Sequence, residues 1–290
     1  MIRSGALALA AFCMTGAHAQ TAPAADAQQA SEQGEDIVVK GAKLPPKVVH
    51  HYVRQVSGTI DGQMSRFDYP ICPRVLGFPE DYSKIIADRI RRVAKAVGAP
   101  VDREDCRANL VVLVAADADA LVKQIRKTMP TYFLGVSSSD MHRALRPGPV
   151  HMWNNVVLLN EDNRQAVGGV LTVRSASFIK LPHKQAIAGS TIVLDDDALV
   201  GKSLTQIADY VAMRALSGAK PPSEGIEADT IMTLFDPSVA TPLSVTAVDK
   251  SYLTALYKSD PFDKANAAMG RISGQIGRDA RARGVDTGKE

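Results

Sequence analysis

The sequence predicts an α/β (α+β) protein with a mixed central sheet, flanking helices and a helical C-terminal subdomain. The continuous apolar run at 108–114 is typical of a strand buried on both faces. An amphipathic segment at 83–97 comes before it and a second helical segment at 117–127 follows it, which together make an α/β unit. Further helical spacing then dominates the C-terminal end, at 226–234, 247–257 and 265–278.

Composition excludes several functional classes. The chain has 290 residues, 46% of them hydrophobic and 22% charged, with a formal net charge of +3. A charge this close to zero argues against a dedicated nucleic-acid-binding protein, which needs a basic surface for phosphates. The hydrophobic fraction is too high for a disordered chain. The absence of an apolar run of about 18 residues argues against an integral membrane span.

The N-terminus resembles a bacterial export signal. Arg3 is the only charge before a run of small and apolar residues, and Ala17-His18-Ala19 fits the small-x-small rule for cleavage. We expect a signal peptide at 1–19, cleavage after Ala19, and a periplasmic or secreted protein. Cys13 leaves a lipoprotein as the alternative, although Phe12 stands where such a site needs a small residue.

A linker precedes the predicted domain. Residues 20–35 are rich in Ala, Gln and Pro and hold no large apolar residue, and we expect a disordered tether over 20–47. Within it, Ile37–Val39 is a short β-prone segment flanked by charges, as at the start of many mature TonB-dependent receptors. A solvated linker is the interpretation we favour, and a strand that docks on a cell-envelope protein partner is the other one that the pattern allows. A single globular domain is expected at 48–285, with a disordered tail at 286–290.

The remaining elements follow from periodicity and capping. Strands are expected within 48–60, at 156–159, at 178–179 and at 192–194, and the segment 170–173 is expected to return as a hairpin partner of 156–159. A short helix is expected at 139–145. Ser83 and Ser203 are the expected N-caps of helices at 83–97 and 203–216. Gly98 and Gly218 are expected to end these two helices.

Two cysteines, Cys72 and Cys106, remain after removal of the signal peptide. In an oxidising compartment they predict one structural disulfide, with two buried thiols as the alternative. The pair is expected to tie the start of the helix at 83–97 to the beginning of the central strand.

No catalytic motif emerges from the remaining chemistry. The sequence lacks HExxH, a GxSxG elbow and a phosphate-binding glycine loop, so neither a metal nor a cofactor is expected. His142 and His151 have no ligand spacing that requires them to meet. Asp195–Asp197 is the densest acidic cluster; we favour a structural role ahead of the following helix over cation binding. Trp153, the only tryptophan, is interpreted as a structural residue, with a binding aromatic as the alternative.

The C-terminal half carries a family resemblance. The stretch 201–214 precedes Pro221-Pro222, and the segments 229–236 and 246–257 follow. This order resembles secreted proteobacterial proteins of unknown function that have a zincin-like, metallopeptidase-related layout. The resemblance covers residues 70–280 and implies an edge strand, an "active-site" helix and a helical subdomain that ends in a Leu-Tyr motif.

The sequence departs from zincins at that helix. A zincin places two histidines four residues apart, with a glutamate after the first. In the alignment we adopt, Gln206 and Tyr210 occupy the histidine positions and Ile207 the glutamate position, so the zinc chemistry is lost. The resemblance then implies a residual groove. Four polar residues of this helix are the candidates for lining the groove: Gln206, Asp209, Tyr210 and Arg214. The alternative is that they form the solvent face of the helix or pair within the protein.

Two functions follow from these observations. We favour an exported, non-catalytic binding or envelope-associated protein with a degenerate zincin-like domain. The alternative is a hydrolase or metallopeptidase-like enzyme with a non-standard site built from dispersed His and Asp residues. The sequence specifies no oligomeric state.

Overall fold

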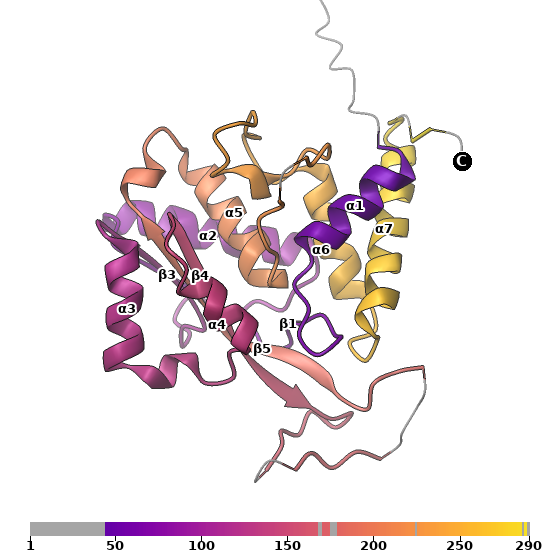
Figure 1. The fold of residues 1–290 in the computed structure, drawn as a ribbon, viewed down its shortest axis with the longest axis horizontal. Coiled ribbons are helices and arrows are strands. Elements are labelled where there is room, and N and C mark those ends of the chain that lie inside the picture. Colours follow the sequence, from indigo (N-terminus) through magenta and orange to yellow (C-terminus); the bar gives the residue numbers. More distant parts are fainter. Residues whose placement is uncertain (1–43, 168–169, 175–178, 224, 286, 289–290) are drawn as a thin grey trace, which may run out of the picture. The chain divides into compact units, whose positions relative to one another are not determined.

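The computed structural model describes residues 44–167, 170–174, 179–223, 225–285 and 287–288. The predicted signal peptide and its cleavage site, most of the tether, the Ile37–Val39 segment and Cys13 lie outside these ranges. Within them the structure confirms a mixed α/β fold (Figure 1).

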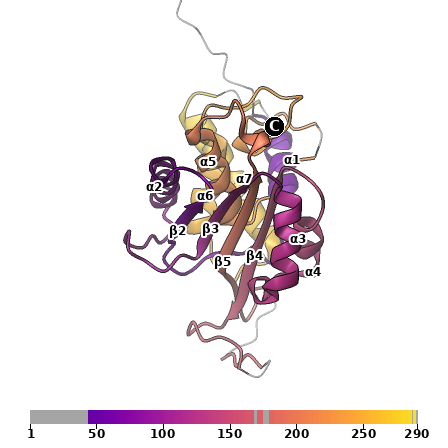
Figure 2. The same ribbon diagram turned by 90° about the vertical axis from the view of Figure 1, so that its left-hand side faces the viewer.

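Five strands form one mixed sheet. Its order is β1-β5-β3-β2, with β4 on the other side of β5, and β4 is the antiparallel strand. Figure 2 shows β2, β3, β5 and β4 side by side. The strands are β1 (Arg66–Phe67), β2 (Pro73–Leu76), β3 (Leu110–Ala115), β4 (Val150–Leu159) and β5 (Lys184–Asp195).

Strand β5 is the centre of this sheet. Its N-terminal part pairs with β1, its C-terminal part pairs with β3, and β4 runs along its whole opposite edge. The ladder between β4 and β5 stays in register from Val150 to Asn155 and shifts at Asn155/Val156. Strand β4 is therefore one outer edge of the sheet, and β2 is the other.

Helices cover both faces of the sheet. Ile192 and Leu194 of β5 pack in the main core with helices α1, α2, α5, α6 and α7. Val193, whose side chain points to the opposite face, packs with α3, η1 and α4. The helices are α1 (Pro46–Val56), α2 (Glu80–Ala96), α3 (Ala118–Thr128), η1 (Pro130–Phe133), α4 (Ser138–Ala144), η2 (Asp197–Leu199), α5 (Leu204–Ser217), η3 (Ile231–Thr233), α6 (Ala247–Lys258) and α7 (Ala265–Ala282).

Local capping explains several helix boundaries. Ser203 caps α5 in a capping box with Gln206, as the sequence predicts for the cap itself. Thr246 and Asp249 form the same motif at α6. Gly218 ends α5 with a φ of 62°, a left-handed conformation that glycine adopts without steric cost. Helix α2 begins at Glu80, so Ser83 lies in its first turn and is not its cap.

Three predictions of secondary structure are wrong. The region expected as a strand within 48–60 contains α1, which starts at Pro46 inside the segment expected as tether. Val49, Tyr52, Val53 and Val56 are all buried, and this spacing places them on one face of a helix. The partner of β4 is β5, whereas 170–173 makes only an isolated bridge through Val170. The expected helix at 226–234 is reduced to η3.

The predicted disulfide is confirmed. Cys72 and Cys106 are bonded, with their Cα atoms 5.9 Å apart and a sequence separation of 34. Cys72 lies just before β2 and Cys106 lies in the connection from α2 to β3. The bond therefore joins the beginnings of two adjacent strands, rather than the start of α2 and a strand.

Among the helices in the described ranges, none has the length and apolar character that crossing a lipid bilayer requires.

The disulfide between Cys72 and Cys106 closes a loop with a sequence separation of 34. Closing a loop of this length restricts the unfolded chain and stabilises the fold by about 3–4 kcal/mol in the chain-entropy model. We expect the double variant Cys72→Ser/Cys106→Ser to lose about that free energy of unfolding in urea titrations. In a chain without residues 1–19, thiol titration after denaturation should find no reactive thiol before reduction. Two reactive thiols at that stage would contradict the bond.

Candidate functional site

Helix α5 is buried almost along its whole length. Every residue from Gln206 to Ser217 is buried, because α2, α6, η3 and the sheet surround the helix. The four residues that the sequence proposes as a groove, Gln206, Asp209, Tyr210 and Arg214, therefore lie inside the domain. Each polar group on such a helix needs a partner from another element.

Asp209 has a complete set of partners. Its carboxylate is fully buried and receives two hydrogen bonds from Arg89 on α2, from Nε at 2.6 Å and from Nη2 at 2.8 Å. The main-chain N–H of Val245 donates a third at 2.7 Å. The hydrogen bond to Asp209 raises the pKa of Arg89. Asp209 is thus a structural anchor for α2 and for the segment before α6, and it lines no groove.

A second buried carboxylate fixes the helical subdomain. Asp249 of α6 accepts hydrogen bonds from the hydroxyl of Tyr52 at 2.9 Å and from that of Thr230 at 2.6 Å. It also accepts bonds from Ile231 and Thr246. Burial raises the pKa of Asp249, and these donors oppose that shift. This network joins α1, η3 and α6.

Arg214 differs from both carboxylates because its charge is not balanced. The residue is only 9% exposed, and none of the ion pairs in the described part of the chain includes it. Its Nη1 donates to the hydroxyl of Tyr210 at 2.7 Å, but its Nε is buried and has no hydrogen-bond partner among the described residues. A buried guanidinium with an unused donor carries a desolvation cost that a ligand can offset.

Arg214 faces a small cavity of about 40 Å³. The cavity lies at the outer edge of β4, with α4 on one side and the end of α5 on the other. Asn154 of β4 lines it, and its side-chain Oδ1 is buried without a hydrogen-bond partner. The other lining residues are Asp140, Arg143, Val150, Met152, Trp153, Gly218, Ala219 and Lys220.

The turn after α5 completes the wall of the cavity. A Cβ atom at Gly218 would lie 3.2 Å from Nδ2 of Asn154, a tight contact, and the positive φ of 62° also favours glycine at this position. The N–H of Lys220 donates to the carbonyl of Val56 at 2.8 Å, which fixes the turn against the end of α1.

The electrostatic character of the cavity is cationic. Arg143, Arg214 and Lys220 contribute positive charge, and Asp140, which pairs with Arg143, is the only carboxylate among the lining residues. Burial lowers the pKa of Lys220, and the neighbouring positive charge of Arg143 lowers it further. Cations held this close to one another favour a bound anion.

The remaining predicted residues have structural roles. Gln206 completes the capping box and donates to the carbonyl of Pro242. Ile207, at the position of the zincin glutamate, is 2% exposed in the core. Of the four candidate groove residues, only Arg214 lines this cavity. Trp153 is 1% exposed and stacks on Phe133, yet it also lines the cavity.

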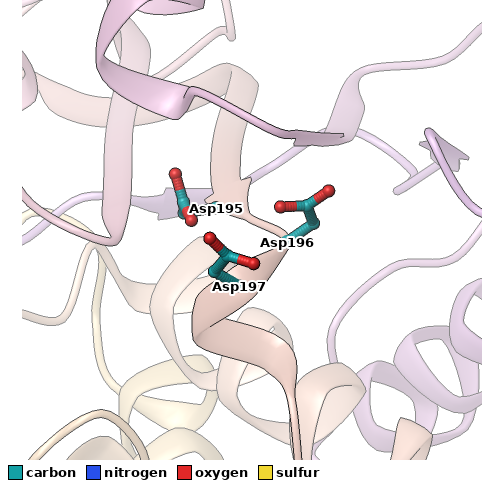
Figure 3. Close-up of side chains that lie close together, drawn as sticks. All are labelled: Asp195, Asp196 and Asp197. Atoms are coloured by element: carbon teal, nitrogen blue, oxygen red, sulfur yellow. The ribbon is translucent and has the colours of Figure 1, made fainter.

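The acidic cluster does not cap α5, the helix that follows it. Figure 3 shows Asp195, Asp196 and Asp197 close together. Asp195 Oδ2 accepts the N–H of Ala118 at the start of α3, and Asp196 is the N-cap of η2. The following helix, α5, is capped by Ser203 instead. Among the described residues, this is the only group of three or more potential metal ligands.

The two central histidines have separate surroundings. His151 is buried, with Nδ1 2.8 Å from the carbonyl of Ala144 and Nε2 3.0 Å from the carboxylate of Asp119. His142 lies in the exposed last turn of α4.

A larger groove of about 560 Å³ runs between β2 and α2. Its charges are mixed, and Arg91 within it pairs with Asp88. The cavity at Arg214 is the better candidate site because its buried charge lacks a partner of opposite sign.

No protein-family model, curated protein or solved structure matches the chain. The geometry of the site is therefore the basis for the functional conclusion.

Arg89, which pairs with α5, and Arg214, which lies on α5, should respond differently to removal. Arg89→Met leaves the carboxylate of Asp209 buried without its cation, and we expect a loss of about 3–5 kcal/mol in the free energy of unfolding. Arg214→Met removes a cation that has no anionic partner and one hydrogen bond to Tyr210, so we expect a smaller loss of about 1–2 kcal/mol in the absence of ligand. Urea denaturation of both variants measures the difference. Equal large losses would show that Arg214 is a structural residue like Arg89.

Proposed function

We propose that this protein is an exported, non-catalytic binding protein, and that the cavity at Arg214 binds an anionic group of its ligand. The observation that carries the proposal is the buried guanidinium of Arg214, which lines a cationic cavity and, among the described residues, has no anionic partner and one donor, Nε, without an acceptor. Arginine is well suited to this role because its planar fork matches carboxylate and phosphate oxygens.

The order of the elements supports a zincin-like origin as part of this proposal. An antiparallel edge strand, β4, is followed by β5, by the buried helix α5 and then by α6 and α7. This is the order that the resemblance implies. On that basis α5 corresponds to the active-site helix, with Gln206 and Tyr210 at the metal-ligand positions. Both side chains are engaged within the protein, which favours binding over metal-dependent hydrolysis.

The location outside the cytoplasm and the partner in the cell envelope also belong to the proposal. They rest on the N-terminal pattern ending at Ala19, on the Ile37–Val39 segment and on the disulfide, a bond typical of oxidising compartments.

Anions should stabilise the folded protein through Arg214. A ligand at tenfold its dissociation constant adds about 1.4 kcal/mol to the stability of the state it binds. We expect acetate or phosphate to raise the midpoint of thermal unfolding more than sodium chloride of the same ionic strength does. Lys123→Gln, which removes an exposed charge on α3, serves as the matched control. The same response in Arg214→Met and in the wild type would refute the site.

Binding should weaken at alkaline pH. Lys220 attracts an anion only in its protonated form, and its pKa is lowered from the ordinary value. The association constant for acetate should thus be constant below that pKa and fall as pH rises through it, at a lower pH than for an ordinary lysine. Calorimetric titrations across this range measure the effect. The variant Lys220→Met should bind more weakly at neutral pH and lose this pH dependence, and an unchanged profile would exclude Lys220 from the site.

A further inference from the structure

The cavity at Arg214 offers more than positive charge, because the open edge of β4 forms one of its walls. The N–H of Asp195 donates to the carbonyl of Pro149 at 3.0 Å, so Pro149 faces β5. In an antiparallel ladder, successive residues alternate between facing the partner strand and facing away. With the register unbroken to Asn155, the main-chain groups of Val150, Met152 and Asn154 point away from β5.

These three residues are among those that line the cavity. Their outward N–H and C=O groups have no main-chain partner in the described part of the chain. Further along the edge the situation changes, since the N–H of Val156 donates to the carbonyl of Gly135. The open part of the edge therefore coincides with the cavity.

The available groups specify a ligand that has both a donor and an anionic acceptor. Nε of Arg214 is a buried donor without an acceptor, and Oδ1 of Asn154 is a buried acceptor without a donor. The strand edge adds carbonyl acceptors beside its amide donors. An inorganic anion satisfies the cations but brings a poor match to these carbonyl oxygens. A carboxylate next to an amide N–H satisfies both sets.

We infer that the cavity binds the C-terminal residue of a polypeptide. Its carboxylate meets Arg214 and Lys220, and its amide N–H meets Asn154 and the open carbonyls of β4. A volume of about 40 Å³ limits the bound part to these terminal groups, so the preceding residues lie outside the cavity. This inference rests on the proposed function and names the ligand class for the same site.

The test compares four probes on the full chain by calorimetry, with the fluorescence of Trp153, the single tryptophan, as a second readout. The probes are N-acetyl-trialanine with a free C-terminal carboxylate, the same peptide with a C-terminal amide, acetate and phosphate. We expect the free-acid peptide to bind about tenfold more tightly than acetate, because its amide N–H adds a hydrogen bond. We expect the amidated peptide to bind at least about tenfold more weakly than the free-acid peptide, because it loses the charge-assisted hydrogen bond of the carboxylate.

A variant separates the two halves of the inference. Asn154→Ala should weaken binding of the free-acid peptide by about fivefold and leave acetate binding unchanged. Far-UV circular dichroism controls for folding, and Lys123→Gln should bind every probe as the wild type does.

The remaining outcomes distinguish this inference from the proposed function. Acetate and phosphate that bind through Arg214 as tightly as the free-acid peptide would overturn the peptide ligand and leave the anion site intact. Equal binding of the acid and amide peptides would also overturn the inference. Failure of all four probes to bind would overturn the proposed function and the inference together.

Discussion

The burial of α5 is the constraint on which the rest of the structure depends. A helix enclosed by a sheet and by other helices leaves none of its polar side chains to water, so each must be satisfied by another part of the chain. Asp209 recruits Arg89 from α2 and the N–H of Val245, and Ser217 bonds back to Met213 within the helix. These contacts determine where α2 and the segment before α6 lie. Arg214 is the exception, because its charge has no anionic partner in the described part of the chain, and the candidate site is the cavity that it lines.

A buried carboxylate also holds the helical subdomain together. Asp249 gathers donors from α1, from the segment around η3 and from its own capping box, so three segments distant in sequence meet at one carboxylate. The hydroxyl of Tyr252, one turn along α6, contacts that of Ser57 just after α1. Because α1 is held here, its last carbonyls are available to fix the turn that carries Lys220. The stability of the subdomain and the geometry of the cavity are thereby linked.

Local signals in the sequence predicted the elements that depend on local chemistry. The apolar run of β3, the capped α5, the α6 and α7 periodicities and the disulfide could all be predicted, since each depends on neighbouring residues or on the pairing of two cysteines. Helix α1 was missed although Val49, Tyr52, Val53 and Val56 have helical spacing. Their β-branched and aromatic character favoured a strand, and Pro46 at the start of the helix was assigned to the linker.

Contacts between residues that are far apart in the chain could not be predicted from the sequence. Arg89 lies on the basic side of α2, where a solvated face is the usual interpretation, and only the fold brings it to Asp209. The cavity combines β4, α4 and the turn after α5, which no spacing connects. Asn154-Asn155 is a signal for this site in the sequence, because the polar pair stands between the apolar residues Trp153 and Val156 of the strand. The choice of β5 as the partner of β4 then decides which main-chain groups of that strand face the cavity.

The central claim is that Arg214 is buried to receive an anion from outside the chain. The most direct measurement follows the side-chain Nε–H signals of the arginines by ¹H–¹⁵N NMR during a titration with acetate, with the Arg214 signal assigned by its absence in Arg214→Met. The account predicts that this signal moves, that the change saturates, and that the signal of Arg89, already paired with Asp209, stays in place. A signal of Arg214 that does not respond to acetate, or that moves without saturation together with the exposed arginines, would contradict it.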